Sequence, residues 1–121
     1  MKQCLVVDDS RVIRKVACRI LEALSFATEE AEDGAAALQA CRRAMPDVIL
    51  LDWHMPNMNG IELTRQLRTL PSFQRTPVLL LTTESDPAKK AEGRAAGATG
   101  WIVKPFSQEQ LLAIVAKLLP A

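Results

Sequence analysis

The sequence predicts an α/β domain in which five short parallel strands alternate with five helices. Two observations support this fold class. Short apolar runs recur along the chain, each bounded by turn signals, and the stretches between them carry apolar residues at helical spacing. Strands that are apolar at nearly every position are typical of a parallel sheet covered by helices on both faces, with right-handed crossovers. The sequence therefore favours one domain built on a doubly wound sheet.

The first strand and the first helix have the clearest signals. We expect a strand over 4–7, followed by a helix that Ser10 caps. One side of this helix is apolar at i, i+3 and i+4 spacing, and the other side is charged. The apolar stripe is Ile13, Val16, Ala17, Ile20, Leu21 and Leu24, and the charged side is Arg11, Arg14, Lys15, Arg19 and Glu22.

Two further strand–helix units follow. Residues 26–31 alternate weakly among glutamates, as edge strands do. Asp33 opens a second helix, which ends before Pro46. Residues 47–51 form the most apolar run, which predicts the central strand of the sheet, and a third helix begins near Gly60.

The last two units differ in how firmly their helices should be held. After a fourth strand over 78–81, the helix over 86–96 has an apolar side made mostly of alanine. Gly93 within it costs about 1 kcal/mol relative to alanine, so we expect this helix to be loosely held. A fifth strand over 101–103 leads to a helix with a strong apolar stripe, formed by Leu111, Leu112, Val115, Leu118 and Leu119.

Composition excludes several classes of protein. With 121 residues, a net charge of +1 and 49% apolar residues, the chain has no electrostatic footprint for nucleic acid or an anionic membrane. No apolar run approaches the ~20 residues of a membrane span, and the N-terminus lacks signal-peptide architecture. We expect a cytoplasmic monomer. The three cysteines lack metal-ligand spacing and are interpreted as small buried residues in a reducing compartment: Cys4, Cys18 and Cys41.

Charged residues stand where three of the predicted strands end. Asp8 and Asp9 close the first run, Asp52 closes the third, and Lys104 closes the fifth. In an open α/β sheet, ligands bind at this edge. Two adjacent acids exceed what a helix cap needs, and no helix follows Asp52 directly. Three carboxylates and one ammonium suit a divalent cation and a phosphoryl group.

Four motifs surround these charged strand ends. They are Val6-Val7-Asp8-Asp9-Ser10, the run Leu50-Leu51-Asp52-Trp53-His54-Met55-Pro56-Asn57-Met58-Asn59-Gly60, Leu80-Leu81-Thr82-Thr83-Glu84, and Val103-Lys104-Pro105-Phe106. With these motifs in this order and spacing, the chain is similar to the receiver domains of two-component response regulators, specifically the stand-alone CheY-like type, over essentially its whole length. The resemblance implies a flavodoxin-like sheet with strand order 2-1-3-4-5, and we expect a receiver over 1–121 with no output domain.

The resemblance also implies the chemistry of the site. Asp52 is the expected phospho-acceptor, with a histidine kinase as donor. Mg²⁺ would be held directly by Asp9 and Asp52, through water by Asp8, and by the backbone carbonyl of His54. The ammonium of Lys104, aimed inward by a cis bond to the following proline, would neutralise phosphoryl oxygens. The domain would then catalyse only its own phosphorylation and dephosphorylation.

The same family pattern suggests a switch and a control of phosphate lifetime. Thr82 would move toward the phosphoryl group, and Trp101 would follow it, changing a surface made by the loose helix, the fifth strand and the last helix. The family usually has Tyr or Phe at the Trp101 position, so packing is an equal alternative there. His54 and Glu84 are candidates for tuning phosphate lifetime, although a lone solvated histidine with no task is possible. Trp53 is interpreted as packing.

Several functions stay open at this point. A phosphorylated receiver could change its affinity for a downstream target such as a flagellar motor switch, or serve as a phosphate sink or a phosphorelay intermediate. A magnesium-dependent phosphohydrolase is disfavoured, because His54 stands where such enzymes usually carry a second acid and no substrate-recognition cap is present. A binding module that is never phosphorylated is disfavoured because the site residues are all intact.

Overall fold

The computed structural model describes residues 2–55, 57–83 and 87–118. Five parallel strands form one sheet in the order β2-β1-β3-β4-β5. This confirms the predicted doubly wound sheet, and β3 is its central strand. The strands are β1 (Gln3–Val7), β2 (Ala27–Ala31), β3 (Val48–Asp52), β4 (Val78–Thr82) and β5 (Gly100–Val103).

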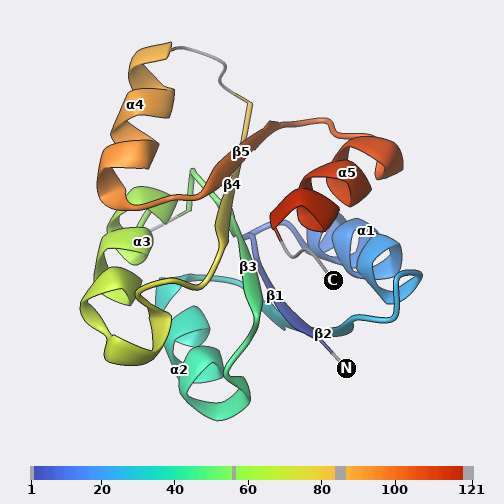
Figure 1. Ribbon diagram of the computed structural model, residues 1–121, viewed down its shortest axis with the longest axis horizontal. Helices are drawn as coiled ribbons and strands as arrows, with labels where there is room; N and C mark the ends of the chain where they lie inside the picture. Colours follow the sequence, from blue (N-terminus) through green and yellow to red (C-terminus); the bar gives the residue numbers. More distant parts are fainter. Residues whose placement is uncertain (1, 56, 84–86, 119–121) are drawn as a thin grey trace.

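The helices cover both faces of the sheet. Figure 1 shows α1 and α5 on one face and α2, α3 and α4 on the other. Successive residues of each central strand point to opposite faces, so the core divides into two clusters, one beneath each helical layer. The helices are α1 (Arg11–Glu22), α2 (Gly34–Ala44), α3 (Gly60–Thr69), α4 (Pro87–Ala96) and α5 (Gln108–Leu118), with a 3₁₀ turn, η1 (Pro71–Phe73), after α3.

Side-chain caps fix where the helices begin. The Ser10 hydroxyl accepts a hydrogen bond from the Ile13 N–H (3.3 Å), as predicted. Asp33 caps α2, and Asn59 forms a capping box with Glu62 at the start of α3. These caps set the path of the chain from each strand end into the next helix.

Gly60 brings α3 directly against the end of β3. A Cβ atom here would lie 2.6 Å from the carbonyl oxygen of Asp52 and 3.1 Å from the Cα of Trp53. The Gly60 N–H also donates to the Trp53 carbonyl oxygen at 2.9 Å. Glycine is therefore required as a helix-start residue that lets α3 abut the backbone of the strand bearing Asp52.

The orientation of α1 differs from the prediction. Val16 and Leu24 are each 43% exposed, whereas Cys18 is buried. Arg14, predicted on the charged outer side, has a side chain only 13% exposed. Its Nη1 donates to the Asp8 carbonyl oxygen (2.7 Å), and its Nε to Glu30 (2.9 Å). These polar contacts turn the helix away from the orientation that apolar spacing alone would favour.

Helix α4 is weakly anchored, as its sequence predicted. Gly93 and Ala96 are its buried residues. The glycine has a packing reason, because a Cβ there would lie 2.9 Å from Leu80 Cδ1 and 3.4 Å from Trp53 Cζ3. Little apolar side-chain area therefore holds this helix to the sheet.

Two predictions from composition can be compared with the structure. Cys4, Cys18 and Cys41 are all free and buried, as expected for packing residues. Burial raises the pKa of the Cys41 thiol to about 11, which disfavours the reactive thiolate. Within the described ranges, no helix combines the length and the apolar character needed to cross a bilayer.

Candidate functional site

Three carboxylates meet at the carboxyl edge of the sheet. Asp8 follows β1 and Asp52 ends β3, and the register that pairs Val7 with Leu51 places these two acids side by side. One oxygen from each of Asp8, Asp9 and Asp52 lies within 4.8 Å of the others. Asp8 is fully buried and Asp52 is 5% exposed, whereas Asp9 faces solvent. The predicted acidic residues are therefore brought together.

Lys104 is the cation of this cluster. Its Nζ lies 2.8 Å from Asp8 Oδ2 and 3.1 Å from Asp52 Oδ1, so a single ammonium bridges the two buried carboxylates. Its backbone N–H donates to the carbonyl oxygen of Thr82 (2.6 Å), which continues the pairing of β5 with β4. The Lys104–Pro105 peptide bond is cis, as the family resemblance implied.

Backbone N–H groups add to the stabilisation of the acids. The Ser10 N–H donates to Asp8 Oδ1 at 2.8 Å, and the His54 N–H donates to Asp52 Oδ1 at 3.4 Å. Asp8 therefore has a donor on each of its oxygens, because Lys104 occupies Oδ2. At Asp52, the His54 N–H and the Lys104 ammonium donate to the same oxygen, Oδ1.

The balance of charge leaves Asp52 poorly stabilised as an anion. Burial and the nearby Asp8 carboxylate raise the pKa of Asp52 to about 6, although Lys104 and the His54 N–H oppose this shift. Burial opposes the charge of Lys104, but its hydrogen bonds to Asp8 and Asp52 outweigh that effect and raise its pKa. Lys104 pairs with two of the three clustered carboxylates, Asp8 and Asp52, so the cluster retains negative charge that a further cation could neutralise.

The donor set fits a magnesium ion. Hard carboxylate oxygens are the ligands this cation prefers, and it needs only one or two of them because it retains waters. Asp9 provides an exposed oxygen beside the two buried acids, so the cluster is open to solvent on one side. Burial and the Asp8 carboxylate both disfavour the charged form of Asp52, and a divalent cation beside the two acids would offset both effects.

The structure places three of the four remaining predicted residues, Thr82, His54 and Trp101. Thr82 ends β4 and is buried, and it pairs with Val103, the residue before Lys104, at the same edge of the sheet. His54 is exposed two residues beyond Asp52. Glu84 lies outside the described residues. Trp101, on β5, is partly buried, and its ring packs edge-to-face on Trp53 with centroids 5.1 Å apart.

Sequence reasoning missed two of these contacts. The hydrogen bond from Arg14 to the Asp8 carbonyl oxygen has no signal in the spacing of charges along α1. The Trp53–Trp101 contact joins two strands that are not neighbours in the sheet, so no local pattern reveals it. These are the only two tryptophans in the chain, which is the one signal that could have drawn attention to the pair.

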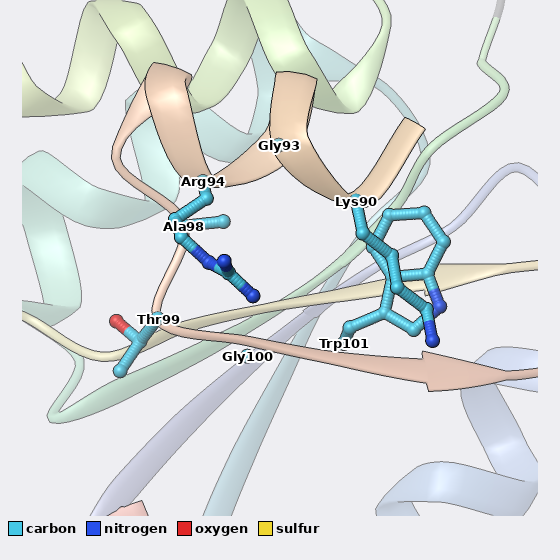
Figure 2. Close-up of a pocket in the computed structure, with 7 residues that line it drawn as sticks. All are labelled: Lys90, Gly93, Arg94, Ala98, Thr99, Gly100 and Trp101. Atoms are coloured by element: carbon cyan, nitrogen blue, oxygen red, sulfur yellow. The ribbon is translucent and has the colours of Figure 1, made fainter. Parts of the chain in front are cut away.

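A small pocket lies between α4 and β5. It has a volume of about 70 Å³ and is lined by Lys90, Gly93, Arg94, Ala98, Thr99, Gly100 and Trp101. Figure 2 shows the side chains of Lys90 and Trp101 lying side by side at one end and Arg94 reaching into it from α4. The pocket lies between two of the three elements that were predicted to form the responsive surface, α4 and β5.

The chain belongs to the response regulator receiver domain family, whose model matches residues 4–116. This confirms the resemblance inferred from its motifs. Chemotaxis protein CheY-3 of Vibrio cholerae is 37% identical over 88% of this chain and 83% of its own length. Phosphate regulon transcriptional regulatory protein PhoB of Rhizobium meliloti is 35% identical over 94% of this chain, which spans about half the length of that relative (50%).

Solved structures agree with the fold. Chemotaxis response regulator CheY4 of Vibrio cholerae superposes with a TM-score of 0.94 at 44% identity, covering 98% of this chain and 99% of that one. The receiver domain of a sensor histidine kinase from Pseudomonas aeruginosa has a TM-score of 0.90 at 26% identity, covering 99% and 98%. That structure has a magnesium ion coordinated in its active site cleft.

Replacing Asp52 by Asn should stabilise the protein at neutral pH in magnesium-free buffer. The pKa of about 6 lies above the ordinary value of 3.8. The native state therefore binds the proton more tightly than the unfolded state, and wild-type stability should fall as the pH rises from about 4 to about 6. We expect Asp52→Asn to be more stable by of order 1–2 kcal/mol at pH 7, with no advantage near pH 4. Denaturant unfolding with a chelator present measures this, and an advantage independent of pH would contradict it.

Proposed function

We propose that this domain is a phospho-acceptor switch in which a histidine kinase phosphorylates Asp52 and the α4-β5-α5 surface changes its affinity for a protein partner. The observation that carries the proposal is the buried Asp8–Lys104–Asp52 bridge beside Asp9, at the edge of the sheet where ligands bind. Membership of the receiver family supports the same chemistry.

In the proposed reaction, a carboxylate oxygen of Asp52 attacks the phosphorus of the donor phosphohistidine. The P–N bond breaks, the imidazole leaves and takes up a proton, and an aspartyl phosphate forms. The Lys104 ammonium already lies 3.1 Å from Asp52 Oδ1, so it can form an ion pair with a phosphoryl oxygen once Asp52 is phosphorylated. Hydrolysis then returns the carboxylate and releases inorganic phosphate.

Asp8, Asp9 and Asp52, with the backbone carbonyl of His54, would hold the magnesium ion. When bound, the ion supplies positive charge that stabilises the charge developing on the phosphoryl oxygens. Asp8 is held by Lys104 and by the Ser10 N–H, so it would orient the cluster from within the core. Asp9 would bind from the solvent side.

The downstream response would begin at Thr82 and Trp101. Thr82 ends β4 one position before the level of Lys104, close to where a phosphoryl group on Asp52 would project. Movement at this strand end would be followed by Trp101 on the adjacent β5 and by the weakly anchored α4. The proposed change is a shift between two populated arrangements of this surface.

The relatives favour a signalling role over a hydrolase. CheY-3 and CheY4 are chemotaxis proteins, and PhoB is a transcriptional regulator. Their sequence similarity to this chain supports a protein target in chemotaxis or a related two-component pathway. A phosphate sink or a relay intermediate would use the same chemistry without the output surface.

The first functional prediction concerns the acceptor itself. With Mg²⁺ and acetyl phosphate, the wild-type chain should gain one phosphoryl group, and Asp52→Asn should gain none, because the nucleophilic oxygen is replaced by an amide. Asp9→Ala should slow phosphorylation by at least ~10-fold by weakening the cation site. Intact-mass spectrometry over time measures both effects.

Asp47→Asn is a matched control, because Asp47 precedes the same strand at the opposite edge of the sheet, where it accepts the Gln3 N–H. This variant should be phosphorylated at the wild-type rate. Phosphorylation of Asp52→Asn with wild-type kinetics would exclude Asp52 as the acceptor.

A second prediction concerns phosphate lifetime. His54 is exposed two residues beyond Asp52, beside the expected path of the hydrolytic water. His54→Ala should change the dephosphorylation rate severalfold, with a flatter pH dependence between about 6 and 8, where histidine side chains commonly change charge. His54→Gln, which is polar but does not ionise, separates charge from shape. The measurement is the loss of phosphate over time from purified phosphoprotein that has been separated from its donor. Equal rates for the wild type and both variants at every pH would mean that His54 is only a solvated surface residue.

A further inference from the structure

Trp53 directly follows Asp52, and its backbone is held on both sides. Its N–H donates to the Leu81 carbonyl oxygen of β4 at 2.8 Å, and its carbonyl oxygen accepts the Gly60 N–H of α3 at 2.9 Å. The side chain is 4% exposed. A displacement of the Asp52 backbone would therefore also displace the Trp53 side chain, because the packed core leaves the indole little room to change its conformation.

The Trp53 ring reaches the aromatic residue of β5. The two indoles pack edge-to-face, with centroids 5.1 Å apart and planes inclined by 73°. The Trp101 Nε1 is buried and has no hydrogen-bond partner among the described residues. The position of the Trp101 ring therefore depends on packing, which includes the Trp53 ring, and no indole hydrogen bond to a described residue has to break when it moves.

Helix α4 rests on the same pair of rings. The Lys89 ammonium lies 5.7 Å from the centroid of Trp53, and the Lys90 ammonium lies 5.9 Å from that of Trp101. Figure 2 shows the Lys90 side chain descending from α4 alongside the Trp101 ring. Gly93 lies near both Leu80 and Trp53, because a Cβ there would lie 2.9 Å from Leu80 Cδ1 and 3.4 Å from Trp53 Cζ3. Two consecutive lysines thus place the first half of α4 over both tryptophans.

We propose that Trp53 is a positioning residue for the switch, which couples the backbone of Asp52 to Trp101 and α4 through the edge-to-face indole contact. This inference rests on the proposed function. It adds a second connection between the acceptor and the responsive face, through the centre of the α2–α3–α4 side of the core, separate from the connection through Thr82. It gives Trp53, which is also a packing residue of the core, a role in coupling.

The test uses the fact that the chain has only two tryptophans. In Trp53→Leu, the one remaining indole N–H signal in a ¹⁵N–¹H spectrum belongs to Trp101. Its displacement on adding Mg²⁺ and beryllofluoride, a phosphoryl mimic, is compared with that in the wild type. Fluorine NMR of bound beryllofluoride measures occupancy of the Asp52 site in the same samples. Trp53→Phe is the matched control, because it keeps an aromatic ring beside Trp101.

We expect Trp53→Leu to bind beryllofluoride within a few-fold of the wild-type affinity but to show less than half of the wild-type displacement of the Trp101 signal. Trp53→Phe should retain most of that displacement. A full displacement in the leucine variant at equal occupancy would overturn the coupling role. If Trp53→Leu does not fold, Trp53→Met, which fills more of the site with a flexible apolar chain, is read in the same way. A wild-type chain with no bound beryllofluoride would instead overturn the proposed function, and this inference with it.

Discussion

The rest of the structure is organised around one ammonium group shared by two buried carboxylates. Lys104 lies within 3.1 Å of both Asp8 and Asp52, while Asp9 adds a third acid at the solvent side. Each residue stands at the end of a parallel strand, so the sheet forces like charges together and supplies only one compensating cation. Burial of Asp52, together with the nearby Asp8 carboxylate, raises the pKa of Asp52 to about 6. A site under-neutralised in this way is suited to bind a divalent cation and to respond when a phosphoryl group arrives.

The two sides of this site are held with different strength. Helix α3 holds the backbone of Asp52 and Trp53 in place, because Gly60 allows the start of the helix to contact that backbone directly. Helix α4, by contrast, has Gly93 and Ala96 as its buried residues, and Lys89 and Lys90 place it over the two tryptophan rings. A rearrangement at the strand ends is therefore expected to appear where packing is weakest, in α4 and β5, with the remainder of the domain retained.

Much of this arrangement could be predicted from the sequence, because strand runs, caps and charged strand ends are local patterns. Ser10 and the order of apolar runs specified the elements, and Asp8, Asp52 and Lys104 specified one edge of the sheet. The orientation of α1 could not be predicted, because Arg14 is held inward by its hydrogen bond to the Asp8 carbonyl oxygen. Every residue has a backbone carbonyl, so the sequence does not indicate which one Arg14 will bind. The Trp53–Trp101 contact was missed because it joins side chains across β4. The catalytic roles, and the expectation that 121 residues act without an output domain, stay predictions.

The central claim is that phosphorylation of Asp52 changes the conformation of α4 and β5. Hydrogen exchange of the intact chain, with and without Mg²⁺ and beryllofluoride, tests it most directly. Amides of 87–96 and 100–103 should show the largest changes in protection, several-fold or more, while those of α2 on the far side of α3 should be nearly unchanged. With the site shown to be occupied, identical protection in α4 and β5 in the two states would contradict the account.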